Sequence, residues 1–141
     1  MKRLTLGLIL LITINCCFSL TEKQMKSAAK LVRNSCIPKS KVTEAQVMKL
    51  HAGDWADESN PIKCYMNCAL SMLKVCKKNG EFDLEAALKQ VPTLPESRQE
   101  PTASSMKKCG EEVQANDDKC DSSWRFAKCL YFDNPENYFL P

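Results

Sequence analysis

The sequence predicts an all-α fold, a compact bundle of six or seven helices tied together by disulfide bonds. Apolar residues recur three and four residues apart in successive segments, which is the spacing of amphipathic helices. Residues that favour helix caps stand at the ends of these segments, and no segment shows the alternation of a half-buried strand. Nine cysteines in 141 residues supply the cross-links.

Residues 1–19 are predicted to be a secretory signal peptide. Lys2 and Arg3 precede an apolar run over residues 4–14, and Cys17 and Ser19 occupy the small-residue positions before a cleavage site. The run is too short to span a membrane. Cleavage after Ser19 leaves residues 20–141 as a single domain in an extracellular setting, with residues 133–141 as an apolar tail.

Removal of the leader leaves a nearly neutral chain. Without Lys2 and Arg3 the 20 basic residues become 18, against 17 acidic ones, so the net charge is about +1 by that count. Nucleic-acid binding usually needs a strongly basic surface. We therefore expect no nucleic-acid partner.

The first two helices are predicted over residues 21–35 and 43–52. Each begins with a Thr-x-x-Gln sequence, Thr21 to Gln24 and Thr43 to Gln46, which has the spacing of a capping box. Pro38 is expected to stop the first helix, because proline cannot continue a helix in the usual way.

The central helix is predicted over residues 60–80. Asn60 is the expected N-cap, and Gly80 the expected C-cap after the basic pair Lys77-Lys78. Cys64 and Cys68 lie one turn apart on one face, so they are poorly placed to join each other. Each should reach a different element, which makes this helix the centre of the domain.

Three more helices complete the prediction. Asp83 should cap a helix over residues 84–90, and further helices are expected over residues 102–117 and 120–132. Residues 93–101, with Pro95 and Pro101, are predicted to be an exposed connector. The closing residues 138–140 are too apolar for an ordinary frayed end.

Seven cysteines remain after cleavage, so six can pair and one is left over. A secreted chain meets an oxidising compartment, which favours disulfides. A zinc site does not fit, because no Cys-x-x-Cys occurs and the single His51 is remote from any cysteine. Six cysteines allow fifteen connectivities. Cys120 and Cys129 lie on opposite sides of their helix and should join two different neighbours, which still leaves several pairings open.

The cysteine spacing resembles that of the insect odorant-binding proteins of the six-cysteine kind, the PBP/GOBP family, over the whole mature chain. The matching pattern is Cys36-x27-Cys64-x3-Cys68-x40-Cys109-x10-Cys120-x8-Cys129. The resemblance implies an interlocked pairing of Cys36 with Cys68, Cys64 with Cys120 and Cys109 with Cys129. Each bridge would stabilise the fold by about 3 to 4 kcal/mol on a chain-entropy estimate.

Cys76 is additional to the six-cysteine pattern. We expect it to be a buried free thiol that packs as a small hydrophobic residue. The alternative is a disulfide-linked dimer.

Three short stretches are similar to the LUSH-like branch of that family. They are residues 51–55 (HAGDW), 77–82 (KKNGEF) and 139–141 (FLP). This branch implies ligands such as alcohols and pheromone-type esters.

The residues alone do not decide between an ordinary packed core and an internal cavity, but the family resemblance implies an apolar cavity. An apolar pocket of a few hundred Å³ would suit a ligand of roughly ten to twenty heavy atoms. Ser123 and Tyr138 are candidate polar groups in it, although Ser123 could equally lie at the surface, and the tail is a candidate lid. The predicted pocket residues are Met66, Leu70, Leu73, Val75, Phe82, Leu88, Leu94, Ser123, Ala127, Leu130, Tyr138, Phe139 and Leu140.

The resemblance predicts a secreted carrier that takes small hydrophobic volatiles through sensillar lymph or another extracellular fluid to a receptor or its membrane surroundings. We expect a monomer or weak homodimer, with no cofactor, metal or catalytic residue. Enzyme classes are disfavoured because the chain has no Gly-x-Ser-x-Gly elbow and no phosphate loop. The alternative is a secreted inhibitor, cytokine or venom component with a packed core.

Overall fold

The computed structural model describes residues 19–141. The predicted signal peptide lies outside this range except for Ser19. The described chain forms six α-helices and two short 3-10 turns, and its only strand-like feature is an isolated antiparallel bridge between Cys76 and Phe82. The all-α prediction is confirmed. None of the helices in residues 19–141 is long and apolar enough to cross a bilayer. The elements are α1 (Glu22–Ser40), α2 (Glu44–His51), α3 (Asn60–Met72), α4 (Leu84–Gln90), η1 (Val91–Thr93), α5 (Glu96–Glu112), α6 (Lys119–Asp133) and η2 (Pro135–Asn137).

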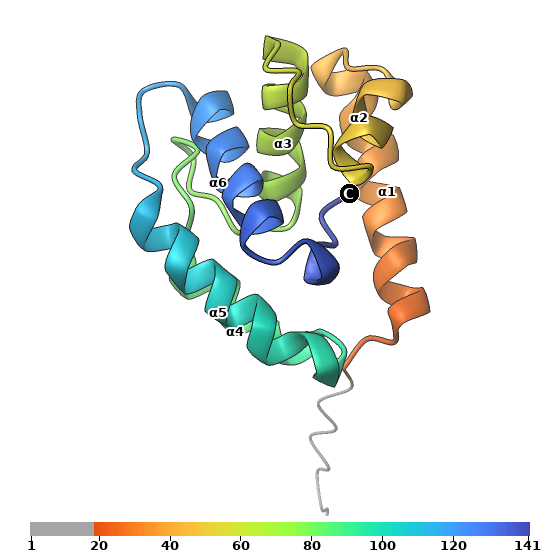
Figure 1. Ribbon diagram of the computed structural model, residues 1–141, viewed down its shortest axis with the longest axis vertical. Helices are drawn as coiled ribbons and strands as arrows, with labels where there is room; N and C mark the ends of the chain where they lie inside the picture. The colour runs from red at the N-terminus through yellow and green to blue at the C-terminus, as the bar shows by residue number, and fades with distance from the viewer. Residues whose placement is uncertain (1–18) are drawn as a thin grey trace, which may run out of the picture.

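Helix α3 is the centre of the bundle, as predicted. It packs against α6 on one side and α1 on the other, while α5 packs against both α4 and α6 (Figure 1). Five of its side chains are buried, which fits an apolar stripe facing two neighbours. After α6 the chain turns through η2, and its final residues return to lie beside α1 (Figure 1).

Three predicted helix starts are confirmed in detail. Thr21 and Thr43 each form a full capping box with the glutamine three residues later. The Asp83 side chain accepts a hydrogen bond from the Ala86 N–H at the start of α4. Such caps satisfy backbone N–H groups that have no partner within the helix.

The predicted end of the central helix was wrong, because α3 stops at Met72. Lys74 adopts a left-handed conformation with φ of 57°, and the Asp83 N–H then donates to the Val75 carbonyl at 2.9 Å. Residues 73–83 therefore form a turn in which some of their backbone N–H and carbonyl groups are hydrogen-bonded. The Lys77-Lys78 pair lies in that turn. The predicted N-cap was also wrong, since Ser59 holds that position and Asn60 is the first helical residue.

Two prolines lie inside helices that they were expected to bound. Pro38 lies in the last turn of α1, which continues to Ser40, and Pro101 lies within α5. Residues 93–101 are therefore not an exposed connector, because α5 begins at Glu96. A proline in a helix interior costs about 3 kcal/mol. Tertiary burial of the α5 residues Thr102, Ser105 and Cys109 offsets that cost.

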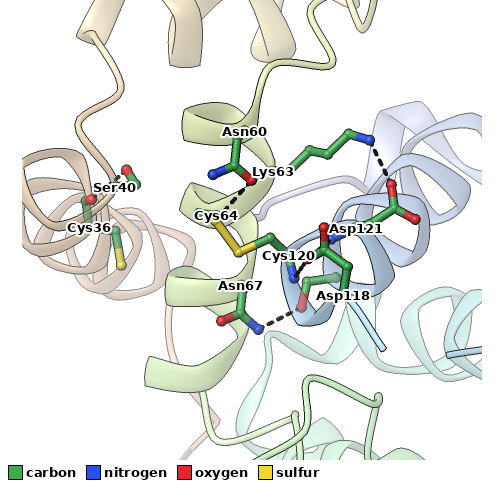
Figure 2. The surroundings of a disulfide bond; sticks show 10 residues. Cys36, Ser40, Asn60, Lys63, Cys64, Asn67, Asp118, Cys120 and Asp121 are labelled. Atoms are coloured by element: carbon green, nitrogen blue, oxygen red, sulfur yellow. Dashed lines mark hydrogen bonds and ion pairs between the residues drawn. A yellow bond between two sulfur atoms is a disulfide. The ribbon is translucent and has the colours of Figure 1, made fainter. Parts of the chain in front are cut away.

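Three disulfide bonds join the helices in a row. Cys36–Cys68 links α1 to α3, Cys64–Cys120 links α3 to α6, and Cys109–Cys129 links α5 to α6. Figure 2 shows the second of these between α3 and α6. This is the pairing that the family resemblance implies. Cys76 forms no disulfide in the described chain.

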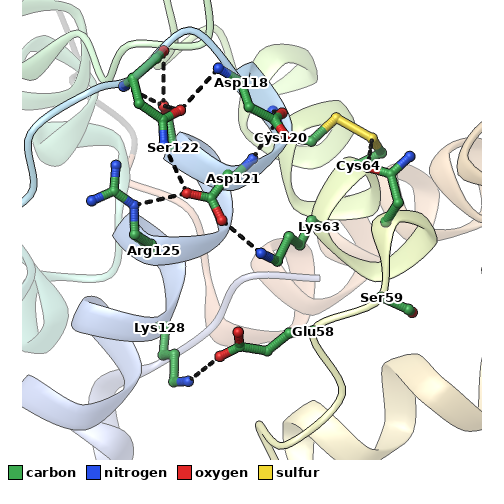
Figure 3. Close-up of polar contacts among 12 residues, drawn as sticks. Glu58, Ser59, Lys63, Cys64, Asp118, Cys120, Asp121, Ser122, Arg125 and Lys128 are labelled. Carbon is green, nitrogen blue, oxygen red and sulfur yellow. Dashed lines mark hydrogen bonds and ion pairs between the residues drawn. A yellow bond between two sulfur atoms is a disulfide. The ribbon is translucent and has the colours of Figure 1, made fainter.

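Ion pairs supplement the α3–α6 contact near the Cys64–Cys120 bond. The Lys63 ammonium lies 2.6 Å from the Asp121 carboxylate, which also faces the Arg125 guanidinium at 3.1 Å (Figure 3). Farther along α6, Lys128 reaches Glu58 at 2.8 Å. The Lys63 amine holds the pKa of Asp121 below its ordinary value, so this carboxylate stays ionised at a lower pH than an unpaired aspartate would.

Candidate functional site

An apolar cavity of about 140 Å³ lies between the helices and the C-terminal residues. Helices α1, α3, α4, α5 and α6 all contribute to its wall, together with η1 and the turn after α3. Its lining residues are Leu20, Met25, Ala28, Ala29, Leu70, Leu73, Val75, Phe82, Ala87, Gln90, Val91, Thr93, Leu94, Met106, Phe126, Leu130, Phe139, Leu140 and Pro141.

The turn over residues 73–83 positions one side of the cavity. Its Phe82 ring stacks on Phe126 of α6, with ring centroids 3.7 Å apart. The hydrogen bond between Asp83 and Val75 closes the turn. This packing holds Val75 and Phe82 at the wall, although neither belongs to a helix.

The two polar side chains in the wall are satisfied within the protein. The Gln90 amide donates to the Leu73 carbonyl at 2.9 Å, and the Thr93 hydroxyl donates to the Gln90 carbonyl at 2.7 Å. Neither therefore needs a hydrogen bond from a ligand. The cavity thus favours apolar groups through burial rather than through directed polar contacts.

Eight of the thirteen predicted pocket residues line this cavity. Their side chains come together from α3, the following turn, the residue after η1, α6 and the C-terminal segment. They are Leu70, Leu73, Val75, Phe82, Leu94, Leu130, Phe139 and Leu140.

The other five predicted pocket residues lie elsewhere. Met66 and Ala127 belong to the packed core between helices, and Leu88 is partly buried on α4 outside the lining, where its neighbour Ala87 takes the inward position. Ser123 is fully buried and accepts a hydrogen bond from the Asn67 amide at 2.9 Å. It is therefore neither a pocket residue nor a surface residue, but a polar contact between α3 and α6.

Tyr138 lies beside the cavity, in an aromatic cluster. Its ring centroid is 5.7 Å from that of Trp55 and 5.2 Å from that of Tyr131. Burial raises the pKa of Tyr138 well above its ordinary value. Its hydroxyl group is buried and has no hydrogen-bond partner among the described residues.

The wall of α1 was missed by the sequence prediction. Met25, Ala28 and Ala29 lie at the spacing of a single helix face, so their apolar stripe was visible in the sequence. What the sequence did not show was that this stripe faces a space instead of another helix. The contributions of Ala87, Met106 and Phe126 carried no distinguishing signal.

The residues after η2 form a partition. Phe139, Leu140 and Pro141 line the cavity on one side and, on the other, a more open cleft of about 260 Å³ against α1. Leu140 is only 6% exposed, so the segment is packed in place. The cavity itself is smaller than the few hundred Å³ expected, because this segment occupies part of the space.

No cluster of three or more His, Cys, Asp or Glu side chains in residues 19–141 has the arrangement of a metal site. The pKa of Cys76 is raised to about 11, mainly by burial. A thiol of that kind is mostly protonated near neutral pH and is a poor nucleophile. The site is therefore described by its apolar space alone.

Comparison with known proteins gives consistent matches over most of the chain. General odorant-binding protein 72 of Anopheles gambiae is 30% identical over 122 residues, covering 86% of this chain and 99% of that protein. General odorant-binding protein 19a of Drosophila melanogaster is 36% identical over 114 residues, covering 78% and 77%. The crystal structure of odorant binding protein 4 from the predator Chrysopa pallens superposes with a TM-score of 0.80 at 47% identity, covering 86% and 99%.

The family model described as the PBP/GOBP family matches residues 19–132. That range contains all three disulfides and most of the cavity wall. The chain therefore belongs to the PBP/GOBP family of odorant-binding proteins.

Proposed function

We propose that this protein binds small hydrophobic volatiles in the apolar cavity and carries them through extracellular fluid to receptors. The candidate ligands are odorants or pheromones such as alcohols, esters and fatty-acid derivatives. Odorant-binding proteins bind small hydrophobic ligands, and family membership supports this reading at the level of a hydrophobic-ligand carrier. The finer ligand classes and the delivery step are our proposal.

The observation that carries the proposal is the apolar cavity lined by five helices and the C-terminal segment. A small domain normally fills its interior at close packing, and cross-links reduce how much of that filling stability requires. A secreted interaction protein with a packed core, the alternative reading, would have no use for such a space. The cavity therefore favours carriage.

The volume limits the size of ligand that fits without rearrangement. A dry apolar cavity of about 150 Å³ accepts a molecule the size of benzene, so the space of about 140 Å³ holds a comparable group. A ligand of roughly ten to twenty heavy atoms needs several hundred Å³. Movement of residues 139–141, which separate the cavity from the cleft, would join the two spaces for such a ligand.

Secretion belongs to the same proposal. The three disulfides require an oxidising compartment to form and persist. Secretion and a signal peptide are typical of this family, and the apolar leader over residues 4–14 supports the same route.

Displacement of a fluorescent apolar probe tests the carrier function. We expect the protein to take up 1-aminoanthracene or N-phenyl-1-naphthylamine, and C6 to C12 alcohols and esters to displace it. Leu94→Trp adds volume at the cavity wall and should weaken probe binding at least about fivefold, since overpacking leaves no room for the guest. Leu31→Trp makes the same change at a position of α1 that is 69% exposed, and should leave binding unchanged. No probe uptake at micromolar protein would favour the packed interaction module.

A further inference from the structure

The cleft next to the cavity is lined by basic groups. Lys26, Lys30 and Arg33 follow one stripe of α1, since they stand four and three residues apart. His51 from the end of α2 and Arg98 from α5 complete the basic lining. No Asp or Glu side chain is among the residues that line the cleft.

The three cations of α1 have no ion pair with any other described residue. The Arg33 Nη1 donates only to the sulfur of Met48 at 3.7 Å, and its Nε is buried without a hydrogen-bond partner. Arg98 differs, because its Nε lies 2.5 Å from the Glu22 carboxylate. Glu22 thus pairs with Arg98 and, one turn before Lys26 on α1, also offsets part of the Lys26 charge, which leaves Lys30 and Arg33 as the least compensated cations.

A second buried donor lies at the same cleft. Tyr138 lines it, and the Tyr138 hydroxyl is buried without a partner. Buried polar groups in proteins are nearly always hydrogen-bonded, so an unpaired hydroxyl and an unpaired guanidinium N–H from residues that line one cleft need an explanation. A carboxylate oxygen accepts from both kinds of donor.

The cleft and the apolar cavity are neighbours through shared walls. Met25, Ala29 and the segment 139–141 line both spaces. A molecule with its charged end in the cleft can therefore extend an apolar chain past these residues into the cavity. The two lining sets match the two ends of an amphiphile, cationic at one end and apolar at the other.

We propose that the cleft holds the carboxylate of an alkyl acid whose hydrocarbon chain occupies the apolar cavity, with Arg33, Lys30 and Lys26 as the binding cations and the Tyr138 hydroxyl as a further donor. This inference rests on the proposed carrier function and names the ligand class that the carrier prefers. Arg33 is half-buried and makes the directed contact, whereas the exposed Lys26 and Lys30 supply attraction that salt screens.

The test compares dodecanoic acid with 1-dodecanol, which share chain length and differ in charge. Affinities are measured by calorimetry and by probe displacement at pH 7.5 in low salt. The wild type is expected to bind the acid more tightly than the alcohol. Arg33→Gln and the double variant K26Q/K30Q should each weaken the binding of dodecanoic acid roughly fivefold and leave the affinity for 1-dodecanol unchanged. Raising the salt to 0.5 M should reduce the acid's advantage.

The matched control is K23Q/K39Q, which removes two charges from exposed positions of α1 outside the cleft. It should leave both affinities unchanged. Equal binding of acid and alcohol by the wild type would overturn the proposal, as would an equal loss of acid affinity in the control. If Arg33→Gln does not fold, K26Q/K30Q still decides, because both lysines are exposed.

The failure of this inference is separable from the failure of carriage. If the alcohol binds and the acid has no advantage, the carrier function stands and the carboxylate site is wrong. If neither ligand binds and no probe enters, the carrier function itself is wrong and the carboxylate site is rejected with it.

Discussion

Gly80 lies so close to Lys119 that a Cβ built on the glycine would stand 2.5 Å from the Lys119 Cα and 2.9 Å from its carbonyl oxygen. The contact fixes the turn over residues 73–83 against the first residue of α6. Cys120, whose disulfide joins α6 to α3, follows directly. Because the same turn supplies Val75 and Phe82 to the cavity wall, this backbone contact positions part of the site.

Replacement of Gly80 by alanine should destabilise the fold by about 1 to 3 kcal/mol, because the residue has a φ of +84° and no room for a methyl group. Urea unfolding monitored by circular dichroism measures the change. Gly110→Ala is the matched control. Gly110 lies within α5, and a Cβ there would meet only the side chains of Leu84 and Phe82, at 3.8 Å or more. Alanine is more favourable than glycine in a helix interior by up to about 1 kcal/mol. A neutral Gly80→Ala would contradict the close contact.

The starts of α1, α2 and α4 could be predicted from sequence, whereas the end of α3 could not. Thr21, Thr43 and Asp83 cap through local hydrogen bonds to residues three positions away, so the signal is contained in a few residues. The end of α3 depends instead on the distant contacts of Gly80 with Lys119 and Gln90 with Leu73. Such contacts are not visible before the fold is known.

Cys76 is half-buried, less than the fully buried thiol expected from the sequence, and should behave as a free thiol of low reactivity. With a pKa of about 11, its thiolate fraction at pH 8 is about one part in a thousand, and reaction with an aromatic disulfide reagent should be slow. For the chain beginning at Leu20, we expect much less than one thiol per molecule to react with the reagent within minutes in the native state. After unfolding in guanidinium, one thiol per molecule should react. Cys76→Ser should abolish the second signal. A dimer on a non-reducing gel would contradict the free-thiol reading.

The C-terminal segment is held by a hydrogen bond from the Asn137 amide to the Thr102 hydroxyl, 2.8 Å long. Thr102 is only 5% exposed, so Thr102→Val keeps the shape and leaves the amide unpaired, at a cost of about 1 to 2 kcal/mol. Loss of this bond should loosen residues 139–141, which begin two positions after Asn137 and line the cavity. We therefore expect faster release of the apolar probe, measured by stopped-flow fluorescence. Ser104→Ala changes an exposed hydroxyl on the same helix and should leave release unaltered. Equal release rates would show that this bond does not restrain the segment.

The candidate site could be predicted only where a residue's helix face determined its direction. Leu70 and Leu130 follow the apolar stripes of α3 and α6, and both reach the cavity. Met66 and Ala127 follow the same stripes, but the close α3–α6 contact buries them in the core. The stripe alone does not say where two helices separate, because crossing geometry decides which turn of each helix faces a space.

His51 should make stability fall in mildly acid solution. Partial desolvation and the charge of Arg33 lower its pKa below the ordinary value of 6.5. Well above pH 6.5 the residue is neutral in both states. As the pH falls through 6.5 the unfolded chain takes up the proton first, so the free energy of unfolding decreases until His51 also protonates in the fold. The carboxylates with lowered pKa, such as Asp121 and Asp133, act at lower pH, below their ordinary value of 3.8.

His51→Gln should therefore flatten the stability profile between pH 7.5 and 5.5, as measured by urea unfolding, and leave the fall below pH 4 in place. An unchanged slope in the variant would assign the effect to another group. Dodecanoic acid provides a further discrimination, because a carboxylate in the cleft would offset the Arg33 charge and raise the pKa of His51. The acid should then reduce the slope of the wild type while 1-dodecanol does not, since only the acid brings a negative charge to the cleft.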